Sequence, residues 1–295
     1  MGKGLTITVV FEAGSLNYGE GVGNISELKK VNRGNGQTYT FASRQCLGFD
    51  IRRLGAELFD WKMDTVTKNG TIQYKKDITI EDSEEMDLFG YMKTASRSNA
   101  TTRSAAVRLS PAFSMEPYKS DMDFLNNKGL ADRIDENPNL ANIEQHQSFY
   151  TYTMTVDLNR VGKDADIELD NTEKAKRLRE LLTIVKLLNR NIRGRQETLS
   201  PVFVVGGVYD LANPFFQGRI KLGIRKNNYV INVEPLNDAL EIGILDNHVK
   251  DNTLIGIIDG IFTNKDEIEK ILGDKVLSVE NFFKKLELQV AEVYK

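Results

Sequence analysis

Two arginines in the segment SRQCLGFDIRRLG stand on either side of a glycine. Arg44, Gly48 and Arg52 follow at four-residue spacing, so on a helix that advances about 100° per residue they lie along one line, with Gln45 beside it. A guanidinium is a fork-shaped phosphate donor, and the glycine would let a phosphodiester lie close to the helix. The pattern predicts a phosphate-binding face, with Arg53 pointing away. Alternatively, Gly48 allows close packing against a strand and the arginines point to water.

Basic residues also gather in three windows that contain no acid. These windows are residues 28–49, 88–115 and 211–233, and each carries four basic residues. The net charge of −3 would by itself argue against a nucleic-acid ligand. It is, however, the sum of three cationic windows and an acidic rest of the chain. Such segregation suits an anionic ligand on one surface. The alternative is chance clustering of charges on solvated faces.

The cations outside the first helix favour contacts with a nucleic-acid backbone over contacts with bases. Residues 93–108 set cations among small hydroxyl and amide side chains. Arg190, Arg193 and Arg195 gather at the end of a predicted helix, where interaction with the helix dipole explains them equally well. Aromatic residues are not interleaved with these cations, so we expect no bases stacked across a sheet.

Other site chemistries find little support in the sequence. The loop GEGVG lacks the third glycine and the adjoining helix of a dinucleotide-binding fingerprint, so we interpret it as a flexible loop near a partner. Neither His146 nor His248 has a metal ligand at a suitable spacing. We therefore expect no catalytic residue, no metal and no cofactor, although a carboxylate site for Mg²⁺ stays open as an alternative.

Composition indicates a folded protein of the cytoplasm. The chain has 295 residues, of which 40% are hydrophobic, enough for a core. Its single cysteine, Cys46, excludes an internal disulfide and suits a reducing compartment. The start MGKGLTITVV is too polar for a signal peptide, and no run approaches the roughly 18 apolar residues of a membrane span.

Periodicity predicts the elements that position these residues. Alternating apolar residues predict strands over residues 5–11, 87–94, 149–156, 200–209 and 228–233. Spacings of three and four predict helices over residues 41–59, 170–193, 264–272 and 278–293. Asp170 would cap the second helix and Gly194 would end it. Asn69-Gly70 predicts a hairpin.

This order of elements is that of a split βαβ unit. We therefore predict an α+β fold of the ferredoxin-like, RNA-recognition-motif-like type. The prediction covers residues 1–295 as a single domain, with inserts at about 60–86 and 95–148 and a C-terminal helical part at about 240–295.

Five stretches of the chain, in order over most of residues 5–216, carry a family resemblance. They are SLNYGEGVGNISELKK, SRQCLGFDIRRLG, DLFGYMKT, TRSAAVRLSPAFSMEPY and NRNIRGRQETLSPVFVVGGVYDLANPFF. The chain resembles the backbone subunits of type I CRISPR Cascade complexes, the "Cas seven" family, in its DevR or type I-B branch. The resemblance implies an RNA-recognition-like palm in which the two inserts form finger or thumb elements.

The resemblance also implies partners and contact residues. Copies of such proteins stack head to tail along the guide RNA (crRNA), grip its backbone and present its bases to target DNA beside other Cascade subunits. Type I members look non-catalytic. The implied RNA contacts are Asn17, Lys29, Arg33, Arg44, Gln45, Arg52, Lys93, Arg97, Arg103, Arg108, Arg193 and Arg195.

Three functional hypotheses follow from the sequence. The first is a non-enzymatic, guide-RNA-binding backbone subunit of an antiviral surveillance complex. The second is a metal-dependent endoribonuclease acting on CRISPR RNA or target RNA. The third, transcriptional autoregulation through DNA, is suggested only by the DevR name of the family.

Overall fold

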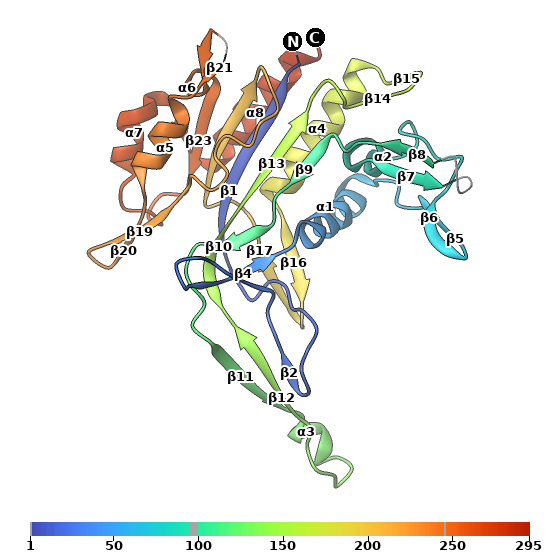
Figure 1. The fold of residues 1–295 in the computed structure, drawn as a ribbon, viewed down its shortest axis with the longest axis vertical. Helices are drawn as coiled ribbons and strands as arrows, with labels where there is room; N and C mark the ends of the chain where they lie inside the picture. The colour runs from blue at the N-terminus through green and yellow to red at the C-terminus, as the bar shows by residue number, and fades with distance from the viewer. Residues whose placement is uncertain (1, 95–99, 245) are drawn as a thin grey trace.

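A long sheet forms the centre of the molecule in a computed structural model that describes residues 2–94, 100–244 and 246–295 (Figure 1). The strands lie in the order β24-β23-β18-β1-β13-β10-β4-β3, with β9 also paired to β13. Their bounds are β1 Gly4–Gly14, β3 Lys30–Asn32, β4 Thr38–Ala42, β9 Val107–Leu109, β10 Ala112–Ser114, β13 Gln147–Asp157, β18 Phe203–Tyr209, β23 Thr253–Ile257 and β24 Val276–Leu277. All pairs are antiparallel except β23 with β24.

Strands β1, β13 and β18 form the buried middle of this sheet. β1 pairs with β13 along its whole length, from Gly4 opposite Asp157 to Gly14 opposite Gln147. On its other side it pairs with β18. Close backbone approach explains a glycine in β18, because a Cβ on Gly206 would lie 2.0 Å from the main-chain oxygen of Thr6.

Helices cover both faces of the sheet. One face packs against α1 (Arg44–Phe59), α4 (Asn171–Lys186) and α8 (Val279–Val293), and this layer contains the larger hydrophobic core. Part of the other face packs against α5 (Val233–Leu240), α6 (Val249–Asn252) and α7 (Lys265–Leu272), with a second core between them. Ser43 caps α1 by accepting from the Cys46 N–H, and Asp170 caps α4 by accepting from the Glu173 N–H.

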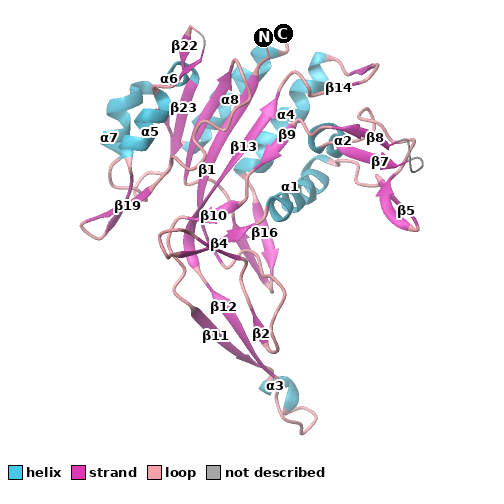
Figure 2. Ribbon diagram, in the orientation of Figure 1, coloured by secondary structure: helices cyan, strands magenta, loops and turns pink. Residues whose placement is uncertain are grey.

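Two extensions project from the sheet (Figure 2). The arm, residues 121–145, consists of β11 (Asp121–Asn126), α3 (Lys128–Ala131) and β12 (Leu140–Gln145), with β2 (Ile25–Ser26) paired to β12. The side lobe lies beyond α1, away from the central sheet (Figure 2). It consists of β5 (Val66–Asn69), β6 (Thr71–Tyr74), α2 (Glu84–Phe89), β7 (Tyr91–Thr94) and β8 (Ala100–Arg103).

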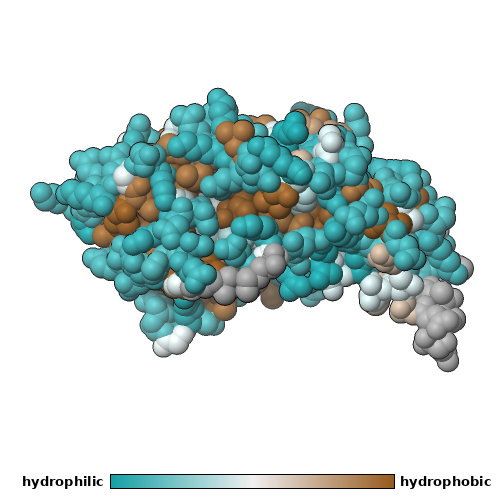
Figure 3. Space-filling view, turned by 90° about the horizontal axis from the view of Figure 1, so that it is seen from above, coloured by the Kyte–Doolittle hydropathy of each residue, from teal (hydrophilic) through white to brown (hydrophobic). Residues whose placement is uncertain are grey.

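Short elements complete the chain. They are β14 Lys163–Asp164, β15 Ile167–Glu168, β16 Asn189–Ile192, β17 Arg195–Thr198, β19 Leu222–Arg225, β20 Asn228–Ile231, β21 Gly243–Ile244, β22 Asn247–His248 and the 3-10 turn Gly273–Lys275. Seen from the end where both termini lie, the surface is mostly hydrophilic and is interrupted by a band of hydrophobic side chains (Figure 3). No described helix is both long and apolar enough to span a membrane.

Several predicted elements are confirmed. Strands occupy most of residues 5–11, 149–156 and 200–209, and helices occupy 264–272 and 278–293 almost to the residue. The Asn69-Gly70 hairpin connects β5 and β6. The chain is therefore a mixed α/β protein.

The strand predicted over residues 87–94 is wrong. Its first half belongs to α2, and its second half, β7, pairs with β8 in the side lobe instead of joining the central sheet. The place beside β13 is taken by β9 and β10. Residues 95–148 are therefore not wholly an insert, because Val107 and Ala112 within them lie in the core.

Both long predicted helices are shorter in the structure. Residues 41 and 42 belong to β4, and α1 begins only after Ser43. The helix predicted over 170–193 ends at Lys186, and its last residues form β16, which pairs with β17. Arg193 and Gly194 both have positive φ at the hairpin tip. Gly194 thus supplies a tight turn and does not end a helix.

Candidate nucleic-acid interface

The loop at residues 15–18 contacts the three segments that carry Lys29, Arg44 and Arg193. Asn17 Nδ2 donates to Ser43 Oγ at 3.3 Å, next to the first residue of α1. The main-chain oxygen of Asn17 accepts from the Lys29 N–H at 2.9 Å. The guanidinium of Arg193 lies over the Tyr18 ring, 4.2 Å from its centroid. The structure therefore brings distant parts of the sequence to one site.

We call this site the loop interface and define it by Asn17, Lys29, Arg44, Gln45 and Arg193. Arg44, Gln45 and Arg193 are exposed, Lys29 is half-buried and Asn17 is buried. Within the described residues, none of the three cations has a carboxylate oxygen within 4 Å. Unpaired cations on one surface give a positive potential suited to phosphate.

Two half-buried arginines hold the hairpin β16–β17 against this loop. Arg190 pairs with Asp50 of α1 at 2.7 Å and also donates to the main-chain oxygen of Leu16 at 2.8 Å. Arg195 pairs with Glu197 at 2.8 Å and donates to the main-chain oxygen of Ser15 at 3.3 Å. Arg195, a candidate RNA contact, is therefore occupied by protein partners, and its role here is to position the loop.

Two side chains beside the loop interface, Cys46 and Asp50, have raised pKa values. Burial raises the pKa of the Asp50 carboxyl, against the opposing effect of Arg190. Burial also raises the pKa of the Cys46 thiol to about 11. Because a thiol must ionise to act as a nucleophile, Cys46 is chemically inert near neutral pH.

Sequence reasoning missed two aromatic residues at this site. Tyr18 lies under Arg193, and Phe49, one helical turn after Gln45, is 63% exposed. Tyr18 is half-buried, and aromatic rings beside cations are a common platform for stacking nucleic-acid bases. The signal for Phe49 was present, because a large aromatic stands outside the apolar stripe of Leu47, Ile51 and Leu54. Tyr18 had no comparable signal.

The predicted two-arginine cradle on α1 is wrong. Arg52 Nε lies 2.7 Å from Glu85 Oε1, and its guanidinium stacks over Phe89 with 4.3 Å to the ring centroid. A Cβ on Gly48 would meet Arg52 Nη1 at 3.0 Å, so the arginine itself fills the space expected for a phosphate. Arg52 thus ties α1 to the side lobe. Arg44 remains exposed as predicted.

Arg53, predicted to point away from the phosphate-binding face, is engaged by the protein itself. Its Nη2 donates to the main-chain oxygen and to Oδ1 of Asn189, both at 2.8 Å. Its Nη1 donates to Glu57 at 2.9 Å. Arg53 therefore joins α1 to the hairpin that carries Arg193.

Two candidate contacts in the segment 93–108 are engaged by the protein itself. Arg103 is buried, donates to Asp87 Oδ1 at 2.7 Å and to the Arg160 main-chain oxygen at 2.8 Å. A buried and fully paired guanidinium cannot reach a ligand, so Arg103 is corrected from an RNA contact to a structural residue. Lys93 donates to the main-chain oxygen of Ile78 and lies 4.6 Å from the Tyr91 ring centroid. Arg97 lies outside the described residues.

The remaining two candidates lie away from the loop interface. Arg33 is exposed near the turn between β3 and β4, with its guanidinium 5.6 Å from the Tyr39 ring centroid. Arg108 is exposed on β9, on the sheet face opposite Val107. Neither has a carboxylate partner within 4 Å in the described part of the chain.

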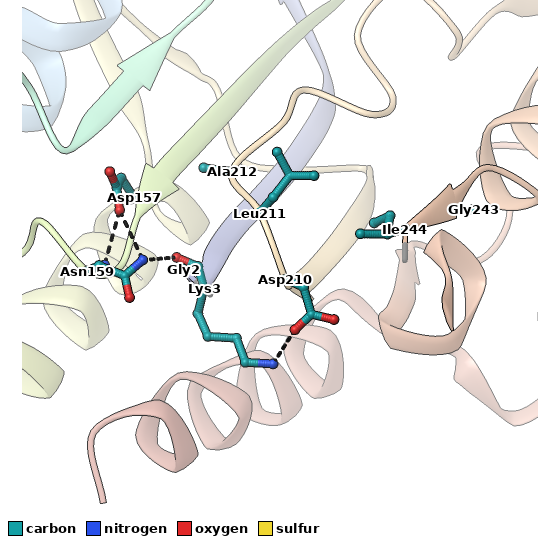
Figure 4. Close-up of a pocket in the computed structure, with 9 residues that line it drawn as sticks. All are labelled: Gly2, Lys3, Asp157, Asn159, Asp210, Leu211, Ala212, Gly243 and Ile244. Carbon is teal, nitrogen blue, oxygen red and sulfur yellow. Dashed lines mark hydrogen bonds and ion pairs between the residues drawn. The ribbon is translucent and has the colours of Figure 1, made fainter. Parts of the chain in front are cut away.

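A cavity of about 560 Å³ beside the start of β1 does not suit an anion (Figure 4). Lys3, a lining residue, donates to Asp210 Oδ1 at 2.6 Å, and Asn159 donates to Asp157 Oδ1 at 3.3 Å. Two carboxylates line it and its lysine is already paired. Among the described residues, no three His, Cys, Asp or Glu side chains gather closely enough to hold a metal ion.

The fold and the loop interface define a mixed α/β protein with a basic surface built on loops beside its sheet. The chain belongs to the family described as CRISPR-associated negative auto-regulator DevR/Csa2, whose model matches residues 5–234. This match confirms the family resemblance of the sequence. No curated protein matches the chain.

Solved structures share the fold over nearly the whole chain. A chain of a "CRISPR RNA-guided surveillance complex, pre-nicking" is similar with a TM-score of 0.62 and 13% identity, covering 98% of this chain and 99% of that chain. A chain of a "CRISPR RNA-guided surveillance complex" has a TM-score of 0.56 and 12% identity, with the same coverage. At such identities the similarity shows a common fold.

Proposed function

We propose that this protein is a guide-RNA-binding backbone subunit of a CRISPR Cascade surveillance complex. The observation that carries the proposal is the loop interface, where three unpaired cations meet: Lys29 before β3, Arg44 of α1 and Arg193 of the β16–β17 hairpin. Family membership and the fold shared with chains of RNA-guided surveillance complexes support it. The protein acts by binding and presenting RNA and catalyses no reaction.

The chemistry of the loop interface favours the RNA backbone as its ligand. Arg44 and Arg193 offer guanidinium forks for phosphate, and Gln45 adds an amide that can contact phosphate or sugar. Tyr18 and Phe49 offer faces on which bases of any identity can stack. Such a surface holds RNA without reading its sequence and leaves recognition to base pairing with target DNA.

We further propose the finer assignments that the family resemblance implied. The central strands in the order β18-β1-β13-β9, with α1 and α4 between them in the chain, support a ferredoxin-like palm. The arm exposes apolar side chains of Phe124, Leu130 and Ile134, which supports contact with a neighbouring copy. We assign the complex to type I-B, with copies polymerising along crRNA and other Cascade subunits at its ends.

Co-expression tests this proposal. The protein is produced with a CRISPR array and its neighbouring genes, purified, and the RNA that it protects is sequenced. We expect RNA from the array, protected at regular intervals. Cellular RNA without enrichment for the array would contradict the proposal. Incubation of the same RNA with the protein, with and without EDTA, separates the alternative, because metal-dependent cleavage would identify an endoribonuclease.

A further inference from the structure

A second cavity, of about 570 Å³, lies on the sheet face opposite α1, α4 and α8. Its walls are the β3–β4 hairpin, β10, the middle of β13 and the loop at residues 217–222. Phe113 pairs with Thr151 and with Phe41 across neighbouring strands, so these side chains share this face. The core that contains α5 and α7 covers the sheet farther along, at β18 and β23.

The three acid-free windows of the sequence meet at this cavity. Apart from residues 151–153 of β13, every lining residue belongs to window 28–49, 88–115 or 211–233. No Asp or Glu lines the cavity. Glu116, the next residue after the lining Met115, directs its carboxylate to Tyr229 at 2.8 Å and Ser148 at 3.1 Å. Parts of the three windows therefore line one cavity without a carboxylate.

Aromatic rings and unpaired cations line this site together. Phe113 is 38% exposed, and its ring centroid lies 5.5 Å from that of Phe41. Tyr39 is half-buried under the guanidinium of Arg33. Arg33 and Lys221 are the charged lining residues, and no carboxylate oxygen of the described chain lies within 4 Å of either. Arg108 extends the positive surface on the same face.

Two hydroxyl groups of the cavity, those of Ser110 and Thr153, are already satisfied by the protein. Ser110 Oγ accepts from the Thr153 N–H at 2.9 Å and donates to the Pro111 main-chain oxygen at 3.0 Å. The Thr153 and Thr8 hydroxyls bond to each other at 2.7 Å. These groups are therefore poorly placed to read the edge of a base, so recognition rests on stacking and charge.

We propose that this cavity binds one nucleotide of a single-stranded nucleic acid. Its base stacks on Phe113 and Tyr39, and its phosphate lies between Arg33 and Lys221. Aromatic faces with cations at the rim and no carboxylate match the chemistry of a nucleotide. The site is separate from the loop interface, because different residues form it, so it goes beyond the proposed function.

Photochemical crosslinking tests the site. The full-length protein is irradiated with a short single-stranded oligonucleotide that carries 5-iodouracil, and crosslinked peptides are identified by mass spectrometry. We expect crosslinks at Phe113 or Tyr39. The experiment is run once with an RNA and once with a DNA oligonucleotide. We expect both to crosslink because neither base stacking nor phosphate binding depends on the sugar. Crosslinks confined to Tyr18 or Phe49 would overturn this site and leave the loop interface standing.

Substitutions of the lining residues provide a second test of nucleotide binding in the cavity. Phe113→Leu should weaken crosslinking at Tyr39 by about fivefold or more, and Arg33→Gln with Lys221→Gln should weaken crosslinking most at low salt and make it less dependent on salt. Lys270→Ala with Lys285→Ala, which removes two exposed lysines elsewhere, should leave crosslinking at the cavity intact. If Phe113→Leu changes the oligomeric state without nucleic acid and leaves crosslinking unchanged, a second copy of the chain occupies the cavity and the proposal is overturned.

Discussion

Carboxylate partners separate the arginines of this protein into two groups. Arg52, Arg103 and Arg190 pair with Glu85, Asp87 and Asp50, and they join elements of the protein to one another. Arg44 and Arg193 have no such partner in the described chain and are exposed. A free guanidinium can exchange water and counterions for a phosphate, whereas a paired one must first give up its carboxylate.

The two glycines of α1 provide a test of the corrected role of Arg52. Gly48→Ala should raise the free energy of unfolding by up to about 1 kcal/mol, because alanine favours a helix and only the flexible tip of Arg52 must move. RNA affinity should stay unchanged. Chemical denaturation and RNA titration measure the two effects.

The matched variant in the same helix is Gly55→Ala. Its Cβ would lie 2.3 Å from the buried ring of Trp61, so it should lower the free energy of unfolding by about 1–3 kcal/mol. A strong decrease in RNA affinity of a folded Gly48→Ala protein would instead favour the phosphate cradle.

Asp87 is the carboxylate on which the side lobe depends. It is fully buried and accepts from Arg103 at 2.7 Å, Arg177 at 3.0 Å and the Gly162 N–H at 2.8 Å. Asp87→Asn removes the buried carboxylate that Arg103 and Arg177 share and should lower the free energy of unfolding by about 3–5 kcal/mol. Urea denaturation measures this decrease. The exposed Asp77→Asn should change stability by less than about 0.5 kcal/mol, and equal effects of the two changes would contradict this role.

The candidate site could be predicted from sequence only in part. Arg44 and Gln45 follow from helical geometry, which a single segment determines. The partners of Arg52 and Arg103 come from elsewhere in the fold, and no local pattern reveals them. Arg193 belongs to a basic group that the sequence shows, but its place on a hairpin depends on the pairing of β16 with β17.

At the scale of elements, the arm joins the sheet at His146. This residue follows β12 and precedes β13, its Nδ1 lies 2.7 Å from Thr40 Oγ1, and its ring packs against Tyr118 and Tyr150. Burial lowers the pKa of His146, partly opposed by Glu116 and Asp121. The folded protein therefore favours the neutral imidazole.

Because the pKa of His146 is lowered in the folded protein, His146 makes the protein less stable at low pH. Stability from a neutral His146 is fully present above the unfolded pKa of about 6.5 and is lost as the pH falls through the lower folded pKa. His146→Gln should therefore reduce the loss of stability between about pH 7 and pH 5, measured by denaturation at each pH. The exposed His248→Gln should follow the parent. Identical pH profiles for all three proteins would contradict a role of His146 at the arm root.

Elements with a complete local signal were predicted well. The alternation in β1 and β13 and the capped stripe of α4 identify them without tertiary information. The segment DLFGYMKT has an apolar strand-like pattern, yet Asp87 within it is buried against two arginines and its first half is helical. Tertiary ion pairing thus overrides local propensity there, as it does where α4 gives way to β16.

At the scale of the whole molecule, charge segregation has a structural explanation. Window 28–49 contributes Lys29 and Arg44 to the loop interface, and it contributes Arg33 to the cavity that Phe113 and Tyr39 line. Windows 88–115 and 211–233 contribute Phe113 and Lys221 to the same cavity. The net charge hides this arrangement, and the sequence could not have shown that all three windows converge.

The salt dependence of RNA binding tests the central claim most directly. The logarithm of affinity for a single-stranded RNA of mixed sequence is measured against the logarithm of salt concentration. Arg44→Ala with Arg193→Ala should weaken binding and flatten the slope by about 0.7 for each phosphate that the variant no longer neutralises. Lys270→Ala with Lys285→Ala, which removes two exposed lysines elsewhere, and Arg52→Ala should leave the slope near that of the parent. A double variant at Arg44 and Arg193 with the affinity and slope of the parent would contradict the loop interface as the RNA-binding site.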